Sequence, residues 1–113
     1  MGIRVMVVDD EKLSRVTTAK QLSAAGYEAQ PFDSPFAALQ VLDQEHWHVV
    51  LSDLKMPGMD GLEFLKELKH RSPETMVVLM TAYGTVQTAV EAMRNGAIDF
   101  LTKPFRDQDM LDA

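Results

Sequence analysis

The chain has 113 residues, and its 11 lysines and arginines against 17 aspartates and glutamates leave a formal charge of −6. This length is enough for one compact domain with a hydrophobic core. The lack of cysteine excludes a disulfide scaffold, a thiolate zinc site and a cysteine nucleophile. The acidic balance argues against nucleic-acid binding by this segment, and no apolar run is long enough to cross a membrane, so we expect a soluble, cytoplasmic domain.

Short apolar runs alternate along the chain with segments of helical periodicity. In chain order they predict strand Ile3–Val8, helix Lys12–Ala25, strand Glu28–Phe32, helix Pro35–Glu45, strand Val49–Ser52, helix Gly61–Arg71, strand Met76–Met80, helix Val86–Asn95 and strand Ile98–Thr102. Strands that alternate with helices are joined by right-handed crossovers. We therefore predict an α/β fold with a doubly wound, five-stranded parallel sheet and helices on both faces.

The predicted helix ends carry residues typical of caps. Ser34 stands before Pro35, and Asp60 stands before the third helix, where each side chain can accept from a backbone N–H. Gly26 and Gly96 stand where helices end. The caps thus support the predicted boundaries.

Two apolar patterns and one pair of histidines complete the survey. In the fourth helix an apolar stripe at helical spacing consists of Val86, Ala89, Val90 and Met93. Methionines in the predicted strands are expected to fill the core, namely Met6, Met76 and Met80. His46 and His48 have no evident third ligand, so we interpret them as loop residues rather than as a metal site.

Polar residues stand at or just after the ends of four predicted strands. They are Asp9, Asp10, Asp53, Thr81 and Lys103. Taken singly each has an ordinary interpretation, since an aspartate after a strand often caps the next helix. The carboxyl ends of parallel strands, however, meet at one edge of the sheet, where α/β proteins bind ligands. We therefore predict that these residues form one site.

The residue types in this set favour phosphoryl chemistry. Three neighbouring carboxylates repel one another, so one keeps its proton or a cation enters, and hard oxygen ligands in small number suit Mg²⁺. A lysine opposite the metal fits an anion between them, such as a phosphoryl group in transfer to a carboxylate. Asp53 is then the nucleophile that forms an aspartyl phosphate, and Asp9 and Asp10 hold the metal. The Thr81 hydroxyl donates to a phosphoryl oxygen.

Four motifs in order resemble a response-regulator receiver domain of bacterial two-component signalling. They are Val7-Val8-Asp9-Asp10-Glu11, Asp53-Leu54-Lys55-Met56-Pro57-Gly58-Met59-Asp60-Gly61, Thr81-Ala82 and Lys103-Pro104-Phe105. The resemblance runs from the first strand to the end of the chain. It implies the flavodoxin-like strand order 2-1-3-4-5 and a regulatory phosphoprotein rather than an enzyme. It also implies phosphorylation of Asp53 by a sensor histidine kinase or a phosphotransfer protein.

The resemblance also assigns roles within the site. Asp10, Asp53 and the backbone carbonyl of Lys55 would ligate Mg²⁺ directly, and Asp9 would act through water. Thr81 would be the switch hydroxyl. In the same way, Lys103 would be the cation that binds the phosphoryl group.

Further expectations concern the switch and its timing. Phe100 falls where the family keeps a rotating aromatic, although a plain core aromatic is the alternative interpretation. The Lys103-Pro104 bond would be cis. Lys55 and Tyr83 would flank the phosphoryl group, and we expect Tyr83 to hinder the hydrolytic water and so to prolong the phosphorylated state.

The chain as given would be one receiver domain, residues 1–113, with an output domain beyond it. Residues 106–113 would be only the start of a fifth helix, which is marginal alone. Residues 81–86 and 89–97 look similar to receivers attached to σ54-dependent activators. By family analogy we also expect a homodimer that depends on phosphorylation and forms through the fourth helix.

Other classes of protein share parts of this pattern. A haloacid-dehalogenase-type phosphatase would carry its nucleophile on the first strand with a second Asp two residues on, whereas Lys55 follows Asp53 at that spacing. A flavodoxin-like electron carrier would need a Ser/Thr/Gly-rich phosphate loop after the first strand. A receiver used only for docking would not need the intact set of acids.

Overall fold

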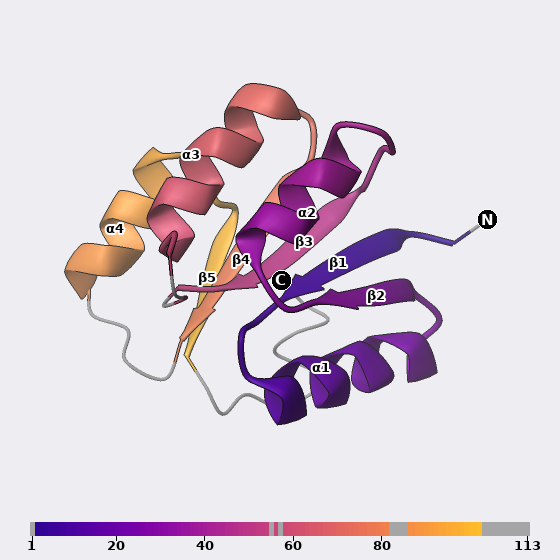
Figure 1. Cartoon of the computed structure of the whole chain (residues 1–113). Helices are drawn as coiled ribbons and strands as arrows, with labels where there is room; N and C mark the ends of the chain where they lie inside the picture. The colour runs from indigo at the N-terminus through magenta and orange to yellow at the C-terminus, as the bar shows by residue number, and fades with distance from the viewer. Residues whose placement is uncertain (1, 55, 57, 82–85, 103–113) are drawn as a thin grey trace.

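The computed structural model describes residues 2–54, 56, 58–81 and 86–102, apart from the side chains of Val86 and Thr102. Its elements, in chain order, are β1 (Arg4–Val8), α1 (Lys12–Ala24), β2 (Glu28–Phe32), α2 (Pro35–Leu42), β3 (Val49–Asp53), α3 (Gly61–Arg71), β4 (Met76–Thr81), α4 (Val86–Arg94) and β5 (Asp99–Thr102). The strands form one parallel sheet in the order β2-β1-β3-β4-β5 (Figure 1). The predicted fold and strand order are confirmed.

Two layers of described helices enclose the sheet, with α1 on one face and α2, α3 and α4 on the other (Figure 1). Alternation along β1 shows how the sequence builds both cores, because successive side chains of a strand point to opposite faces. Val5 and Val7 pack in the cluster that includes Leu22 of α1. Met6 and Val8 pack in the larger cluster beneath α2 and α3.

The predicted element boundaries are correct to within one residue, except at the end of α2. This helix ends at Leu42 rather than at Glu45. The backbone N–H of Gln44 donates to the carbonyl of Val41, three residues back, rather than to the carbonyl four residues back, which interrupts the helical ladder. Strands β3 and β4 each extend one residue beyond the prediction and so include Asp53 and Thr81.

The predicted caps are confirmed. Ser34 Oγ accepts from the N–H of Ala37 at 3.2 Å, and Asp60 Oδ1 accepts from the N–H of Glu63 at 2.9 Å. After α1 and α4 the chain turns at glycines with positive φ, +98° and +106°, a conformation that L side chains rarely adopt.

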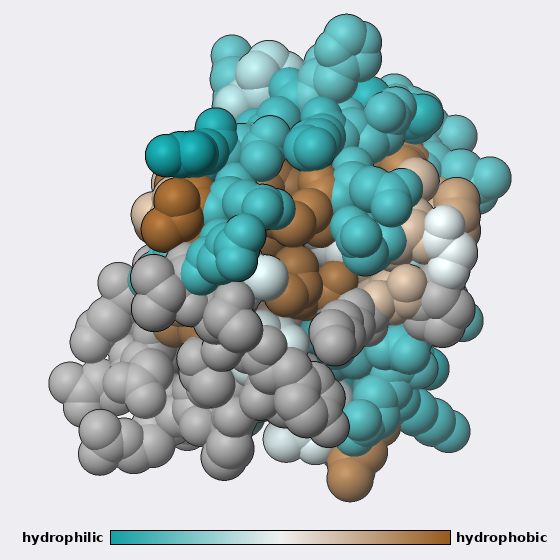
Figure 2. All heavy atoms as spheres, turned by 90° about the vertical axis from the view of Figure 1, so that its left-hand side faces the viewer, coloured by the Kyte–Doolittle hydropathy of each residue, from teal (hydrophilic) through white to brown (hydrophobic). Residues whose placement is uncertain are grey.

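One prediction about apolar side chains is wrong. Met6 and Met80 are fully buried, but Met76 is 45% exposed because β4 begins at the rim of the sheet. In α4 the side chain of Ala92 is buried, whereas Val90 and Met93 of the apolar stripe are exposed. Figure 2, which faces the side of α3 and α4, shows hydrophobic atoms at the surface among hydrophilic side chains. None of the helices in the described ranges is long and apolar enough to span a membrane.

Candidate functional site

The strand order brings the first and third strands together at the carboxyl edge, defined here as the end of the sheet where the strands finish. Val8, the last residue of β1, pairs with Ser52 of β3. Asp9 and Asp10 directly follow β1, and Asp53 directly follows Ser52. The sheet alone therefore places acids from two separate segments side by side, as predicted.

The three acids form a compact cluster. Asp9, Asp10 and Asp53 each offer a carboxylate oxygen, and these oxygens all lie within 4.8 Å of one another. Burial falls across the cluster, since Asp9 is fully buried, Asp53 is half-buried and Asp10 is exposed. The site is thus closed beneath by the sheet and open to solvent on the side of Asp10.

Hydrogen bonds orient the acids of the loop between β1 and α1. The backbone N–H of Asp9 donates to the carbonyl of Phe32 at 3.1 Å, which continues the pairing with β2. Oδ1 of Asp9 accepts from the N–H of Glu11 at 3.0 Å. A buried carboxylate needs such a partner, because burying a charge without one is costly.

The backbone around Asp53 is held at several points. The Ser52 hydroxyl donates to the carbonyl of Asp53 at 3.0 Å, and the N–H of Leu54 donates to the carbonyl of Met80 at 2.9 Å. The N–H of Gly61 donates to the carbonyl of Leu54. A Cβ atom on Gly61 would lie 2.7 Å from both the carbonyl oxygen of Asp53 and the Cα of Leu54, so only glycine allows α3 to begin this close to the acid.

The donor set fits Mg²⁺. Oxygens on one octahedral Mg²⁺ lie about 3 Å apart when adjacent and about 4 Å apart when opposite, given bonds of about 2.1 Å. The three carboxylate oxygens, which lie within 4.8 Å of one another, can reach this range with small side-chain adjustments. Three like charges also favour a divalent cation among them.

Two further predicted site residues belong to the described strands. Thr81 ends β4 beside the acid cluster, one residue beyond Met80, which pairs with Asp53; its side chain is 1% exposed. Phe100 lies on β5, paired with Leu79, and packs half-buried against the core on the side of α2 and α3. The positions of Lys55, Tyr83, and Lys103 with Pro104 lie outside the described residues.

Two residues at this edge carry roles that the sequence interpretation missed. Arg15 Nη1 donates to the backbone carbonyls of Asp9 and Asp10, at 3.3 and 3.4 Å. In the sequence Gly61 is only the first residue of the third predicted helix and the last of a motif, yet it permits the close approach of α3. The sequence feature that could have indicated this role of Arg15 is its place one turn into a helix that begins two residues after Asp10.

This arrangement defines a doubly wound α/β protein with a cluster of three acids at its carboxyl edge. The family described as the response regulator receiver domain matches residues 5–113. The chain belongs to this family of regulatory signalling domains, as its motifs indicated, rather than to the phosphatase or electron-carrier classes.

Individual proteins are similar over most of the chain. The response regulator protein FleR of Pseudomonas aeruginosa is 46% identical over 112 residues, covering 99% of this chain and 24% of FleR. The DNA-binding transcriptional regulator NtrC of Escherichia coli strain K12 is 42% identical over 101 residues, covering 89% of this chain and 22% of NtrC. This chain therefore spans about a quarter of the length of these relatives.

A solved structure shares both fold and sequence with the chain. The solution structure of the beryllofluoride-activated NtrC4 receiver domain dimer has a TM-score of 0.91 and 34% identity. The match covers 96% of this chain and 89% of that one. The likeness therefore extends over almost the entire fold.

Proposed function

We propose that Asp53 accepts a phosphoryl group and that the domain thereby switches between two states. A carboxylate oxygen of Asp53 attacks the phosphorus, and the bond from phosphorus to the donor breaks in line with that attack. With a sensor histidine kinase or a phosphotransfer protein as donor, the leaving group is a histidine nitrogen. The observation that carries this proposal is the convergence of Asp9, Asp10 and Asp53 within 4.8 Å.

The acids prepare the site for a metal ion. Asp10, Asp53 and the backbone carbonyl of Lys55 would bind Mg²⁺ directly, with Asp9 acting through water. When bound, Mg²⁺ supplies positive charge that neutralises the phosphoryl oxygens. The carboxylate of Asp9 is held by Glu11 N–H, so it remains oriented toward the cluster.

Groups opposite the metal would complete the site and respond to phosphorylation of Asp53. Lys103, ahead of a cis bond to Pro104, would bind a phosphoryl oxygen. The Thr81 hydroxyl would turn toward the phosphoryl group, and Phe100 would rotate into the space released. Thr81 is buried at the end of β4, and Phe100 is half-buried on β5. These two strands pair with each other, so the two residues lie on neighbouring strands.

The partners follow from this switch. We propose an output domain that makes the whole protein a cytoplasmic transcriptional regulator of the σ54-dependent activator type, supported by the likeness to FleR and to the DNA-binding regulator NtrC. We also propose a homodimer that forms on phosphorylation. The exposed Val90 and Met93 of α4 would lie in its interface, and the dimeric NtrC4 receiver supports this assembly.

Acetyl phosphate with Mg²⁺ tests the central step. Wild-type protein should acquire one phosphoryl group, seen by intact mass, that hydroxylamine removes. Asp53→Asn should reduce labelling by at least about 100-fold, because the nucleophile is lost. Asp33→Asn is the matched control, since Asp33 is an exposed aspartate just after β2 at the same edge but outside the acid cluster, and it should label normally.

The outcomes separate the alternatives. Absence of a label on wild-type protein would contradict the proposal and favour a docking module that does not use phosphorylation. Labelling that persists in Asp53→Asn would move the acceptor to another residue. Labelling that requires no divalent cation would contradict the metal site.

The lifetime of the phosphorylated state tests the role of Tyr83. If its ring hinders the attacking water, Tyr83→Ala should speed loss of the label several-fold, with labelling by acetyl phosphate little changed. Tyr83→Phe keeps the ring and should retain the wild-type lifetime. An unchanged rate of loss in Tyr83→Ala would remove Tyr83 from this role.

A further inference from the structure

The loop that carries two of the three acids is tied to a single residue of α1. Arg15 Nη1 donates to the carbonyls of Asp9 and Asp10, and the backbone N–H of Arg15 donates to the carbonyl of Glu11 at 3.0 Å. Three consecutive carbonyls of the loop, those of residues 9 to 11, therefore accept from one residue. The same loop is tightened from within by the bond from Glu11 N–H to Asp9 Oδ1.

The requirements of the helix do not explain a cation at this place. Arg15 lies at the fourth position of α1, near the helix N-terminus, where the helix dipole disfavours positive charge. The first turn of α1 contains no acid, and the N-cap side chain of Glu11 makes no capping bond. The contacts of Arg15 with the loop carbonyls are therefore the stabilising feature that accounts for its position.

We infer that Arg15 is a positioning residue that holds Asp9 and Asp10 in the geometry needed to bind Mg²⁺. A guanidinium has several donors in a fixed plane, so one group can hold two carbonyls at once, whereas a lysine ammonium acts as a single point charge. Arg15 does not bind the metal. It acts through the backbone of the two residues whose carboxylates face Asp53. This inference rests on the proposed metal-dependent function.

Two physical effects of Arg15 on Mg²⁺ affinity have opposite signs. A positive charge near the acids repels the cation, so its removal tightens Mg²⁺ binding as far as Coulomb effects alone are concerned, by an amount that solvent and salt screen. Loss of the loop contacts instead weakens binding, because the carboxylates must then be ordered when the metal binds. The sign of the change therefore distinguishes a positioning residue from a charge that merely lies nearby.

The test uses the whole chain and Mg²⁺ alone, added as MgCl₂ at constant ionic strength and followed by the backbone ¹H–¹⁵N resonances of the loop. Arg15→Gln should raise the Mg²⁺ dissociation constant about three- to tenfold, and Arg15→Lys should raise it less. The Glu11 amide resonance should shift in both variants before any metal is added, since its bond to Asp9 depends on the loop geometry.

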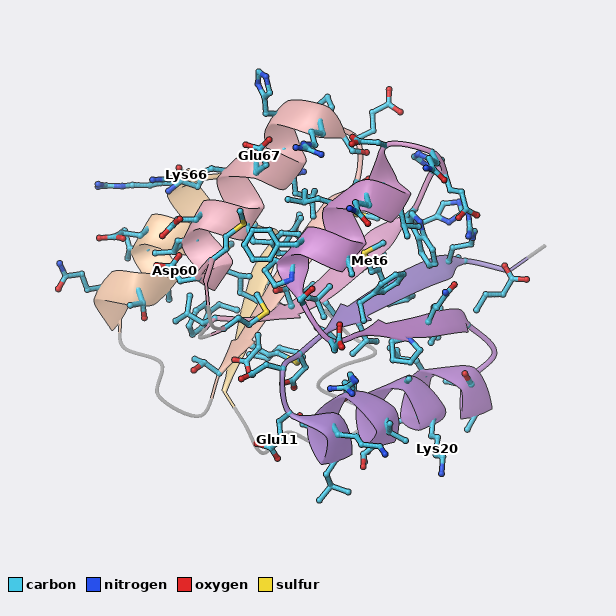
Figure 3. The ribbon with its side chains drawn as sticks, viewed as in Figure 1. Met6, Glu11, Lys20, Asp60, Lys66 and Glu67 are labelled. Carbon is cyan, nitrogen blue, oxygen red and sulfur yellow. The ribbon has the colours of Figure 1, made fainter. Side chains whose placement is uncertain are left out.

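Lys12→Gln is the matched control for charge. Lys12 lies one turn before Arg15 on α1 and is exposed, and its side chain makes no hydrogen bond or ion pair with the described residues. Lys12→Gln removes one positive charge, as Arg15→Gln does. Mg²⁺ binding by Lys12→Gln should be unchanged or slightly tighter than in wild-type protein. Lys20→Gln gives a remote reference, because Lys20 lies farther along α1 from Glu11 and points away from the sheet (Figure 3).

Kinetics provide a second measurement that a general loss of structure would not reproduce. With acetyl phosphate as donor, Arg15→Gln should raise the Mg²⁺ concentration for half-maximal labelling by the same factor as the dissociation constant. The labelling rate at saturating Mg²⁺ should stay within about twofold of wild type, because the metal then orders the loop.

The result that overturns the inference is an Arg15→Gln protein that binds Mg²⁺ as tightly as Lys12→Gln. If Arg15→Gln does not fold, Arg15→Lys decides, and an affinity equal to wild type overturns the inference. If wild-type protein itself binds no Mg²⁺, the proposed metal site fails, whatever the role of Arg15.

Discussion

The two edges of the sheet both gather polar side chains but use them in opposite ways. At the amino edge, where the strands begin, Arg4 forms an ion pair with Glu45 at 2.9 Å and lies 4.0 Å from the ring centre of Trp47. Its backbone N–H donates to Nδ1 of His48 at 3.0 Å. At this edge, groups of opposite charge pair with each other, and hydrogen-bond donors meet acceptors. His46 and His48 have no third metal ligand in the described part of the chain and belong to this network, in line with their interpretation as loop residues.

Deeper in the amino edge, Thr75 joins three segments of the chain. Its side chain is fully buried, and Oγ1 donates to the carbonyl of Trp47 at 2.9 Å and bonds to Ser72 Oγ at 2.6 Å. Lys69 of α3 donates to the carbonyl of Thr75 at 2.6 Å. The exception in this region is the indole N–H of Trp47, which is buried without a partner among the described residues.

At the carboxyl edge three groups of the same charge crowd together instead. This arrangement costs free energy unless a cation or a proton joins it. The contacts at the amino edge thus stabilise the fold. The acid cluster at the carboxyl edge lowers the stability of the fold but creates a binding site, as is common at functional sites. Substitutions at the two edges should therefore separate stability from phosphorylation.

Gly61→Ala should have the largest effect on stability and should also affect the site. The added methyl would lie 2.7 Å from backbone atoms of Asp53 and Leu54, which cannot move without shifting the loop after β3. We expect a loss of about 1–3 kcal/mol in urea unfolding and slower labelling by acetyl phosphate.

Gly96→Ala is the matched control at the opposite edge. Gly96 has φ of +106°, so alanine there is strained by about 1–2 kcal/mol, and its methyl would meet the flexible stem of Lys69. Stability should fall while labelling stays normal. Normal labelling in Gly61→Ala would show that the approach of α3 does not position Asp53.

Thr75→Val should lower stability without any effect on phosphorylation. Valine keeps the shape of threonine but leaves the carbonyl of Trp47 and the hydroxyl of Ser72 without this partner. The expected loss is about 1–3 kcal/mol, measured by urea unfolding. Ser72→Ala removes only one of these bonds at a half-buried position and should cost less. A Thr75→Val protein with impaired labelling would mean that the two edges are coupled.

Most of the fold could be predicted from the sequence because local signals agree with one another. The runs from Val5 to Val8 and from Val77 to Met80 are apolar on both faces, as strands covered on both sides must be. The acids follow strand ends, so a parallel sheet brings them to one edge whatever the details of packing. Asp9, Asp10 and Asp53 could be grouped for that reason.

The parts that could not be predicted depend on tertiary placement. Arg15 can contact the two loop carbonyls only because α1 leaves β1 at a particular angle. The spacing of residues in the sequence does not predict that angle. Gly61 is constrained by the distance from α3 to Asp53 rather than by a turn. Val90 and Met93 have the periodicity of a buried stripe but lie on the outer side of α4, because periodicity identifies a face without saying what covers it.

Asp10→Asn should stabilise the metal-free protein, which is the reverse of what most substitutions do. Removing one of three clustered charges relieves repulsion, by about 0.5–1 kcal/mol given that Asp10 is exposed and screened. The gain in stability on adding Mg²⁺, visible as a higher Tm in wild-type protein, should shrink in this variant. Asp33→Asn should change neither quantity. A less stable Asp10→Asn protein would show that the cluster is not under electrostatic strain.

Glu45→Gln should have the smallest effect, although it breaks an ion pair that is well formed in the structure. Arg4 and Glu45 are 30% and 51% exposed, so solvent screens their attraction and the expected loss is about 0.2–1 kcal/mol. Arg4 would keep its contact with the Trp47 ring and its bond to the carbonyl of His46. High salt should remove most of the difference from wild type, because screening weakens an exposed pair. A loss well above 1 kcal/mol that persists in high salt would mean that the amino edge depends on charge as strongly as the carboxyl edge, and the contrast between the two edges would then fail.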